Sequence, residues 1–171
     1  MTNYFKWFSL EKAYNINHTL LRKAYLAKSM ELHPDKSNID EAEAITLSEY
    51  NNKAYAILKG DYTRLEYILQ LEGIIIPDEK YQLPQEFLME MLEINMDIEN
   101  AKENNDEKAI NDYKLQIEAK KIKEFESAKV ILNQYDTHTI DSDDYKKLKK
   151  FYFISKYLLR IEESINTFAS H

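Results

Sequence analysis

The sequence predicts an all-helical fold made of two parts, and three observations lead to this prediction. Only two glycines and three prolines occur among the 171 residues, so β-hairpin turns and glycine-rich phosphate loops have little from which to form. Apolar residues recur at intervals of three and four along most of the chain, as they do in amphipathic helices. The chain has no cysteine, so packing alone must stabilise its core, and the length is sufficient for this.

The N-terminal part is expected to begin with two helical segments. The aromatic segment 3–10 should form one or two turns that pack on a core. Asn17 is a suitable N-cap for a helix that runs to about Leu32, because its side chain can accept a hydrogen bond from the first turn. Pro34 ends this helix, since the residue before a proline avoids the α-helical conformation.

Two more helices are expected before a joint in the chain. They run from about 40 to 58 and from about 62 to 71, with Gly60 and Gly73 at their C-terminal ends. Residues 74–84 contain two of the three prolines and show no helical period. We therefore predict that this segment is a linker.

The linker divides the chain into an N-terminal domain, residues 1–73, and a C-terminal domain, residues 85–171. The C-terminal domain begins with a predicted helix at 85–103. A polar turn separates it from a second helix of roughly 30 residues, about 45 Å long at a rise of 1.5 Å per residue. Asp141 is the expected N-cap of a last helix that ends near Phe168. Three antiparallel helices joined by short turns are predicted to close into a bundle.

Composition and charge exclude several classes of function. The formal net charge is −7, whereas a nucleic-acid-binding protein needs a basic surface, so no nucleic acid is expected as a partner. No apolar run approaches the length of a membrane span, and no membrane is expected as a partner. The first ten residues are too few and too aromatic for a secretory signal. We expect a soluble, cytoplasmic protein.

The sequence offers little from which to build an active site. None of the four histidines belongs to a zinc motif of the HExxH kind, and there is no phosphate-binding loop or nucleophile elbow. No metal, cofactor or catalytic residue is therefore predicted. The alternative is an enzyme that uses His138 among Asp136, Asp141 and Asp143. A polar turn between two helices explains the same residues and is the favoured interpretation.

The most informative stretch is His33-Pro34-Asp35, which follows a helix that carries Arg22 and Lys23. Pro34 fixes its own backbone angle and has no N–H, so it would hold the two flanking side chains in one arrangement. The carboxylate of Asp35 has no helix to cap and suits a charge-assisted hydrogen bond to an arginine of a partner protein. By itself the tripeptide is compatible with a simple turn that stops a helix, and its context decides between the two interpretations.

Amphipathic helices are predicted on both sides of the motif. Tyr25 lies eight residues before His33, and Leu21 lies four residues before Tyr25. The helix after the motif carries a set of characteristic positions: Asn52, Ala54, Tyr55, Ile57 and Leu58. This arrangement resembles a J-domain over residues 1 to about 72. The resemblance implies an antiparallel helical hairpin with short additional helices, which docks on a DnaK-type ATPase chaperone and stimulates its ATP hydrolysis.

The resemblance also implies a chaperone-binding site around the motif. Its expected residues are His33, Pro34, Asp35, Arg22, Lys23, Lys28 and Lys36. J-domains usually carry several lysines or arginines between the positions of Tyr25 and His33, but here only Lys28 is basic, and Glu31 opposes it. We therefore expect a weaker or more specialised docking interface, with less electrostatic steering.

Three further segments resemble the HscB family of J-type co-chaperones, namely 3–10, 61–73 and 87–93. The resemblance implies that the C-terminal bundle binds an IscU-type iron–sulfur scaffold protein and delivers it to an HscA-type chaperone. The co-chaperone itself holds no cluster. Eukaryotic members can carry an N-terminal zinc module with four cysteines, and this cysteine-free chain is expected to be the bacterial form.

The predicted helix 85–103 has more apolar surface than one buried face requires. One row, spaced four and three residues apart, is a sufficient core face: Phe87, Met91, Ile94, Ile98 and Ala101. A second apolar set remains: Leu88, Met89, Leu92 and Met96. A partner protein is one way to cover it.

The last helix repeats this pattern. Its main row is Leu148, Phe151, Ile154, Leu158, Ile161, Ile165 and Phe168. Phe153 and Tyr157 lie off that row. The HscB resemblance implies a scaffold-binding patch at Leu88, Leu92 and Phe153, to which we add the flanking Met89, Glu93 and Met96.

Other interpretations of these faces stay open. Both additional apolar sets could pack against the J-domain or the long middle helix, because an apolar row at helical spacing is more often core than interface. A J-domain co-chaperone with a different client would share the N-terminal part and differ only in what the bundle binds. In the long middle helix Lys120 and Lys121 interrupt the apolar row, so that face is expected to be solvated or paired with acidic neighbours.

Overall fold

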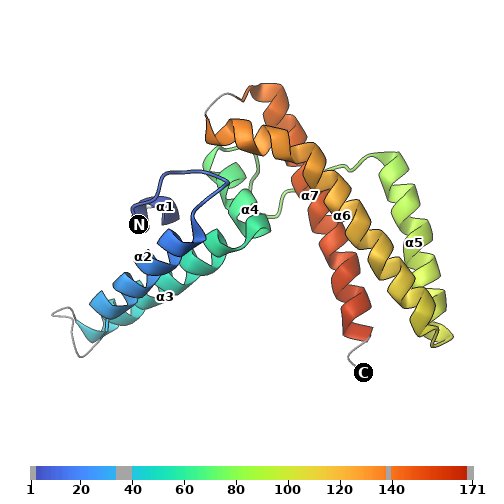
Figure 1. The fold of residues 1–171 in the computed structure, drawn as a ribbon, viewed down its shortest axis with the longest axis horizontal. Coiled ribbons are helices and arrows are strands. Elements are labelled where there is room, and N and C mark those ends of the chain that lie inside the picture. Colours follow the sequence, from blue (N-terminus) through green and yellow to red (C-terminus); the bar gives the residue numbers. More distant parts are fainter. Residues whose placement is uncertain (1–2, 34–39, 138–139, 169–171) are drawn as a thin grey trace. The chain divides into compact units, whose positions relative to one another are not determined.

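The structure is a computed structural model that describes residues 3–33, 40–137 and 140–168 (Figure 1). All regular structure within these ranges is α-helical, which confirms the predicted fold class. The helices are α1 (Tyr4–Trp7), α2 (His18–Glu31), α3 (Glu41–Lys59), α4 (Asp61–Leu71), α5 (Gln85–Glu103), α6 (Glu107–Asp136) and α7 (Ser142–Phe168).

The chain divides into two compact units. The first consists of Met1–Ile75 together with Leu132–Thr139, and the second of Ile76–Ile131 together with Ile140–His171. The last turn of α6 thus belongs to the first unit although the rest of this helix belongs to the second. The periodicity of the sequence does not predict this division of α6.

The helix ends lie where the sequence predicts them, because the expected caps form. The side chain of Asn17 accepts hydrogen bonds from two backbone N–H groups in the first turn of α2, each at 3.0 Å. Oδ1 of Asp141 accepts from two N–H groups in the first turn of α7, at 2.8 and 3.0 Å. Gly73 follows α4 with a φ of +70°, a conformation that favours glycine. Gly60 ends α3 with an extended backbone and leads directly into α4.

In the first unit, α2 and α3 form a hairpin, and α1 and α4 both pack on α3 (Figure 1). The short α1 is held by aromatic contacts, as the sequence predicts for segment 3–10. The ring of Tyr4 lies 4.5 Å from that of Tyr67, whose hydroxyl accepts a hydrogen bond from the backbone N–H of Tyr4 at 3.0 Å. The buried core includes Phe5, Phe8, Leu21, Leu32, Ala54, Leu58, Leu65, Ile68 and Leu69.

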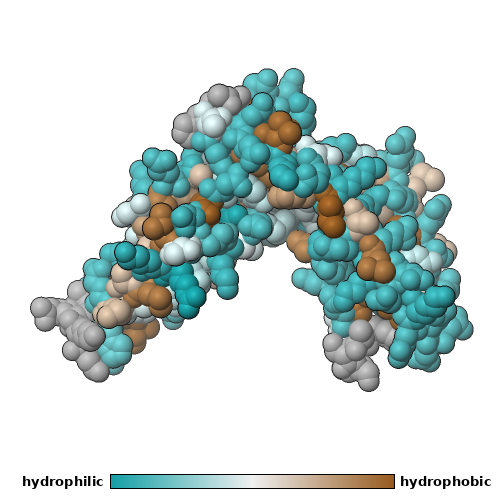
Figure 2. All heavy atoms as spheres, in the orientation of Figure 1, coloured by the Kyte–Doolittle hydropathy of each residue, from teal (hydrophilic) through white to brown (hydrophobic). Residues whose placement is uncertain are grey.

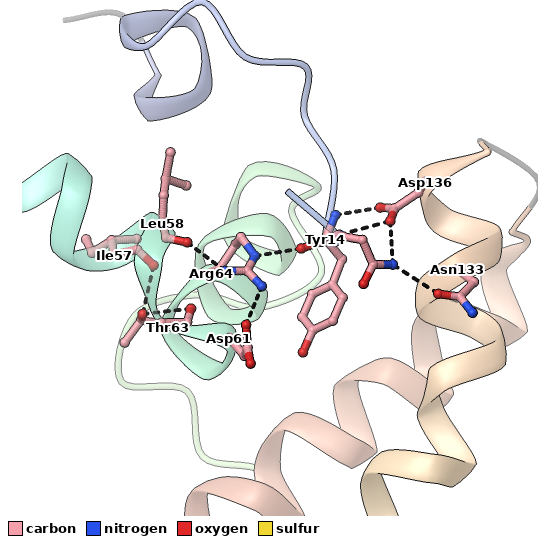
Figure 3. Close-up of polar contacts among 10 residues, drawn as sticks. Tyr14, Ile57, Leu58, Asp61, Thr63, Arg64, Asn133 and Asp136 are labelled. Carbon is pink, nitrogen blue, oxygen red and sulfur yellow. Dashed lines mark hydrogen bonds and ion pairs between the residues drawn. The ribbon is translucent and has the colours of Figure 1, made fainter. Parts of the chain in front are cut away.

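A buried arginine joins three parts of this unit (Figure 3). The Arg64 side chain donates hydrogen bonds to the carbonyl oxygens of Tyr14 and Leu58, both at 2.6 Å, and to Oδ1 of Asp61 at 2.5 Å. Arg64 is only 2% exposed, and its guanidinium lies 5.0 Å from the centre of the Tyr14 ring. One side chain therefore ties the segment before α2 to the junction of α3 and α4.

The last turn of α6 completes this network (Figure 3). The Asp136 carboxylate accepts hydrogen bonds from the backbone N–H of Tyr14 at 2.5 Å and from that of Asn15 at 2.9 Å. The Tyr135 hydroxyl donates to Glu72 at 2.7 Å, and Lys12 pairs with the same carboxylate. Burial of the Tyr14 ring, reinforced by the nearby Asp61, raises the pKa of its hydroxyl to about 12.

The second unit has its own core, made of the rows that the sequence predicts. The predicted core face of α5 is buried, and it packs with residues of α6 and α7: Ile110, Ile117, Ile154, Leu158, Ile161 and Ile165. One expectation for α7 is corrected, because Tyr152 is buried whereas Phe151 is half-buried. Leu148 and Tyr152, four residues apart, are buried on one side of α7. The core of the second unit instead contains Ile154, Leu158, Ile161 and Ile165 from another side, so the buried side changes along the helix. The side chain of Phe168 lies outside the described residues.

The two lysines that interrupt the apolar row of α6 are paired with acidic residues. Nζ of Lys120 lies 2.5 Å from Oε1 of Glu90 in α5, and Nζ of Lys121 lies 2.9 Å from Oε2 of Glu162 in α7. This agrees with one of the two arrangements expected from the sequence. Across the described parts of the chain, none of the helices combines the length and the apolar character needed to cross a membrane.

Replacement of Arg64 by methionine is expected to lower the free energy of unfolding of the first unit by about 2–4 kcal/mol. The variant leaves two buried carbonyl oxygens without a donor, and each unsatisfied group costs about 1–3 kcal/mol. Urea unfolding followed by the fluorescence of Trp7, the only tryptophan, reports on this unit. The matched control is Lys53→Ala, an exposed change on α3 with an expected effect within about 0.5 kcal/mol. Equal stability of the two variants would show that Arg64 is not a structural tie.

Candidate functional site

The outward side of α2 carries part of the predicted chaperone-binding site. Arg22 and Lys23 are exposed near its start, and His33 is exposed beyond its end. Pro34, Asp35 and Lys36 lie outside the described residues. Helix geometry places positions 22, 26 and 30 on one side of α2, since residues four apart lie one above the other. The structure thus brings Arg22 and Lys23 to the same surface, which leads towards His33.

Lys28 is not on that surface. It is half-buried, its Nζ lies 3.1 Å from Oε2 of Glu31, and the same atom lies 5.1 Å from the centre of the Trp7 ring. Because a carboxylate and an aromatic ring already engage the ammonium group of Lys28, its attraction for a partner protein is weaker. The structure therefore separates Lys28 from Arg22 and Lys23.

Two apolar residues that are not among the predicted site residues occupy the outward side instead. Leu26 is 49% exposed and Met30 is 61% exposed. Their spacing of four residues on the side opposite the buried Leu21 is the signal that would have identified them. The outward face of α2 is therefore mixed, basic at its start and apolar nearer to His33.

A buried asparagine fixes α2 against α3. Asn51, which is 1% exposed, donates from Nδ2 to Oγ of Ser29 at 3.0 Å and to the carbonyl oxygen of Tyr25 at 3.3 Å. Its Oδ1 accepts a hydrogen bond from Nε1 of Trp7 at 2.9 Å. The ring of Tyr25 also stacks on that of Tyr55 at 4.2 Å. These contacts hold the helix that precedes the His-Pro-Asp motif in one position.

The second apolar set of α5 is exposed. The exposed fractions are 37% for Leu88, 56% for Met89, 59% for Leu92 and 60% for Met96, and Glu93 is exposed as well. The other face of α5 is fully occupied by the core residues of the second unit. Within the second unit these four apolar side chains are therefore not part of the core. On the side of the molecule shown in Figure 2, hydrophobic residues form separate patches within a largely hydrophilic surface.

Phe153 of α7 has a mixed environment. It is half-buried, and its ring stacks on that of Tyr81 at 4.6 Å with an angle of 4° between the planes. The ring of Tyr152 meets it edge-on at 4.9 Å. Phe153 is therefore positioned by its neighbours and also keeps part of its surface free.

Helix register places the α5 patch beside this side of α7. The Nδ2 atom of Asn95 lies 3.5 Å from the hydroxyl of Tyr157, so these two residues mark where the helices face each other. Leu88 and Leu92 share the side of α5 that carries Asn95, and Phe153 is one turn from Tyr157. We name Leu88, Met89, Leu92, Met96 and Phe153 the apolar face. Met89 and Met96 point further from α7 than Leu88 does.

Two of the carboxylates named in the enzyme alternative have structural contacts. His138 lies outside the described residues, and Asp141 is used as the cap of α7. Within the ranges that the structure describes, no group of three or more histidines and carboxylates is arranged to hold a metal ion. Asp136 accepts backbone hydrogen bonds in the first unit.

Known proteins are similar to this chain in both sequence and fold. A family model described as the HSCB C-terminal oligomerisation domain matches residues 83–166. The co-chaperone protein HscB homolog of Neisseria meningitidis is 32% identical over 111 residues, which cover 62% of this chain and 67% of that protein. The iron-sulfur cluster co-chaperone protein HscB of Mus musculus is 29% identical over 168 residues, covering 95% of this chain and 67% of the mouse protein.

The structural comparison extends this likeness over nearly the whole chain. The crystal structure of human co-chaperone protein HscB matches with a TM-score of 0.80 at 25% identity, and the match covers 98% of this chain and 82% of the human chain. A J-domain followed by a helical domain is consistent with this match. The chain belongs to the HscB family of co-chaperones.

Proposed function

We propose that the protein binds an IscU-type iron–sulfur scaffold protein through the apolar face and presents it to an HscA/DnaK-type ATPase chaperone. In this proposal residues 1–73 act as the J-domain, residues 74–84 as the linker and residues 85–171 as the client-binding domain. The His-Pro-Asp motif stimulates the ATPase of the chaperone, and the protein performs no catalysis itself. It acts in the bacterial cytoplasm and needs no cofactor.

The observation that carries the proposal is the exposure of the apolar face. Helix α5 already buries a complete row of apolar residues, so folding does not require a second one. Four large apolar side chains on one helix remain in water, with exposed fractions from 37% to 60%. Burial of such side chains contributes about 25 cal/mol per Å² of apolar surface, and a patch of this kind marks a site of protein association.

The name of the mouse relative and the position of the apolar face support the choice of client. The relative is called an iron-sulfur cluster co-chaperone, and the patch that the HscB resemblance implies falls on Leu88, Leu92 and Phe153. Helix register supports this choice, because Leu88 and Leu92 share a side of α5 with Asn95, which contacts Tyr157 one turn from Phe153. A scaffold protein with an apolar surface is therefore the client that best fits both observations.

The surface of α2 supports a specialised interface with the chaperone. Lys28 is engaged with Glu31 and Trp7, so Arg22 and Lys23 are the basic residues that α2 offers. The exposed Leu26 and Met30 add apolar contact area near His33. We propose that docking on the chaperone depends more on apolar contact, and less on electrostatic steering, than in J-domains with a basic second helix.

The Asp35→Asn variant is expected to reduce stimulation of the chaperone ATPase by about tenfold or more, because it removes the charge that would pair with a partner arginine. The measurement is single-turnover ATP hydrolysis by the chaperone with increasing amounts of the co-chaperone. Asp40→Asn is the matched control, since it removes a nearby charge while asparagine still caps α3. Full stimulation by Asp35→Asn would contradict the proposed role of the motif.

The triple variant Leu88→Ala, Leu92→Ala and Phe153→Ala is expected to weaken scaffold binding by about tenfold or more, because a few apolar anchors dominate most interfaces. Fluorescence anisotropy of labelled scaffold measures the affinity. The ATPase stimulation without scaffold should not change. Leu115→Ala is the control for loss of an exposed apolar side chain, since Leu115 on α6 is 62% exposed.

A second variant separates binding from folding. Phe153 stacks on Tyr81, so its removal also affects the packing of the second unit, whereas Leu88 and Leu92 do not belong to the core. The double variant Leu88→Ala and Leu92→Ala should keep the melting temperature of the wild type and still bind more weakly. Wild-type affinity of this double variant would rule out the apolar face of α5 as the client site.

A further inference from the structure

A cleft in the second unit lies between residues 79–83 and α7. Its volume is about 320 Å³, near the lower end of the range for ligand pockets, so it fits one or two side chains rather than a large ligand. It is lined by Glu79, Lys80, Tyr81, Leu83, Phe153, Lys156, Tyr157 and Arg160. Phe153 belongs both to this cleft and to the apolar face, so the two surfaces are continuous.

The aromatic walls of the cleft are held in place by their neighbours. The rings of Tyr81 and Phe153 are stacked, with an angle of 4° between their planes. The ring of Phe87 packs edge-on against that of Tyr157, with 5.6 Å between the ring centres. The Tyr157 hydroxyl accepts a hydrogen bond from Nδ2 of Asn95 at 3.5 Å. The cleft therefore presents a preformed surface on which an apolar or aromatic side chain can pack.

The cleft is positively charged although the whole chain has a net charge of −7. Three basic residues and one acidic residue line it. The acidic one, Glu79, pairs with Lys149 at 2.5 Å and accepts a hydrogen bond from the backbone N–H of Ile76 at 3.2 Å. The hydrogen bond from Lys149 lowers the pKa of the Glu79 carboxyl. Lys149 does not line the cleft, and its positive charge compensates the negative charge of the Glu79 carboxylate.

The three basic side chains of the cleft have no carboxylate partner within the described part of the chain. Among the residues that the structure describes, no ion pair involves Lys80, Lys156 or Arg160. Nζ of Lys156 lies 5.7 Å from the centre of the Tyr152 ring, which is a neutral partner. Most other lysines of the second unit are paired with nearby acids. Lys80, Lys156 and Arg160 differ from them, because no described carboxylate compensates their positive charge.

We propose that this cleft binds an acidic segment of the client protein, in which a carboxylate stands next to an apolar or aromatic side chain. The carboxylate pairs with Arg160, whose guanidinium can bind it through two parallel hydrogen bonds, and with Lys80. The neighbouring side chain packs on the Tyr81 and Phe153 rings. The inference rests on the proposed function, because the occupant is the protein that the apolar face carries.

The test is a titration of fluorescently labelled IscU-type scaffold with the full-length double variant Lys80→Gln and Arg160→Gln at several salt concentrations. The expected result is an affinity about tenfold lower than that of the wild type at low salt, because two charge-assisted contacts are lost. The dependence of affinity on salt should also become shallower, since fewer charges then attract the partner. Lys156 is left unchanged because it packs on Tyr152.

The matched control is the double variant Lys108→Gln and Lys123→Gln. It removes the same net charge from two exposed positions on α6 that do not line the cleft. Its affinity is expected to stay within about twofold of the wild-type value. Circular dichroism melting verifies that both variants fold.

The outcomes separate the inference from the proposed function. If both double variants bind as tightly as the wild type, or if both bind equally more weakly, the cleft is not a site for an acidic segment. The proposed role of the apolar face would not be affected by either result. A wild-type protein that does not bind the scaffold at all would overturn the proposed function and the inference with it. Selective weakening by Lys80→Gln and Arg160→Gln supports the inference.

Discussion

The buried guanidinium of Arg64 is the contact on which the arrangement of the first unit depends. It satisfies the carbonyl oxygens of Tyr14 and Leu58, pairs with Asp61 and lies over the Tyr14 ring, so one side chain joins three segments (Figure 3). Tyr14 in turn donates its backbone N–H to Asp136 in the last turn of α6. Because an unpaired charge in the core is far more costly than a paired one, the burial of Arg64 couples the stability of these segments. The α2–α3 hairpin, whose helices flank the His-Pro-Asp motif in the sequence, is connected to this network through the carbonyl oxygen of Leu58 in α3.

The second unit shows how a helix can serve a core and a partner at once. One side of α5 is buried in the core, while the apolar face on its other side stays in water. The pairs Lys120–Glu90 and Lys121–Glu162 fix α6 against its two neighbours, so the exposed side of α5 is held in place without being covered. A rigid apolar surface lowers the entropic cost of association. The positive cleft beside Phe153 adds charge to one edge of this surface and favours a partner of matching chemistry.

Local sequence signals predict most of the fold, because caps and apolar periodicity act within a few residues. Asn17, Asp141 and Gly73 mark helix ends for this reason, and the core row of α5 follows from spacing alone. The contacts of Arg64 and Asp136 are different, since the hydrogen bond between Tyr14 and Asp136 joins positions 122 residues apart. No local pattern encodes such a contact. For the candidate site, the pattern predicts that α5 has an extra apolar face, but the engagement of Lys28 and the charge of the cleft depend on neighbours from other helices.

Binding of an iron–sulfur scaffold protein to the apolar face is the step on which the proposed function depends. Isothermal titration of the wild-type protein with an IscU-type scaffold, repeated at several temperatures, tests it most directly. We expect saturable one-to-one binding with a negative heat-capacity change, because apolar surface leaves water when the complex forms. Absence of binding, or binding without a negative heat-capacity change, would show that the apolar face serves another purpose.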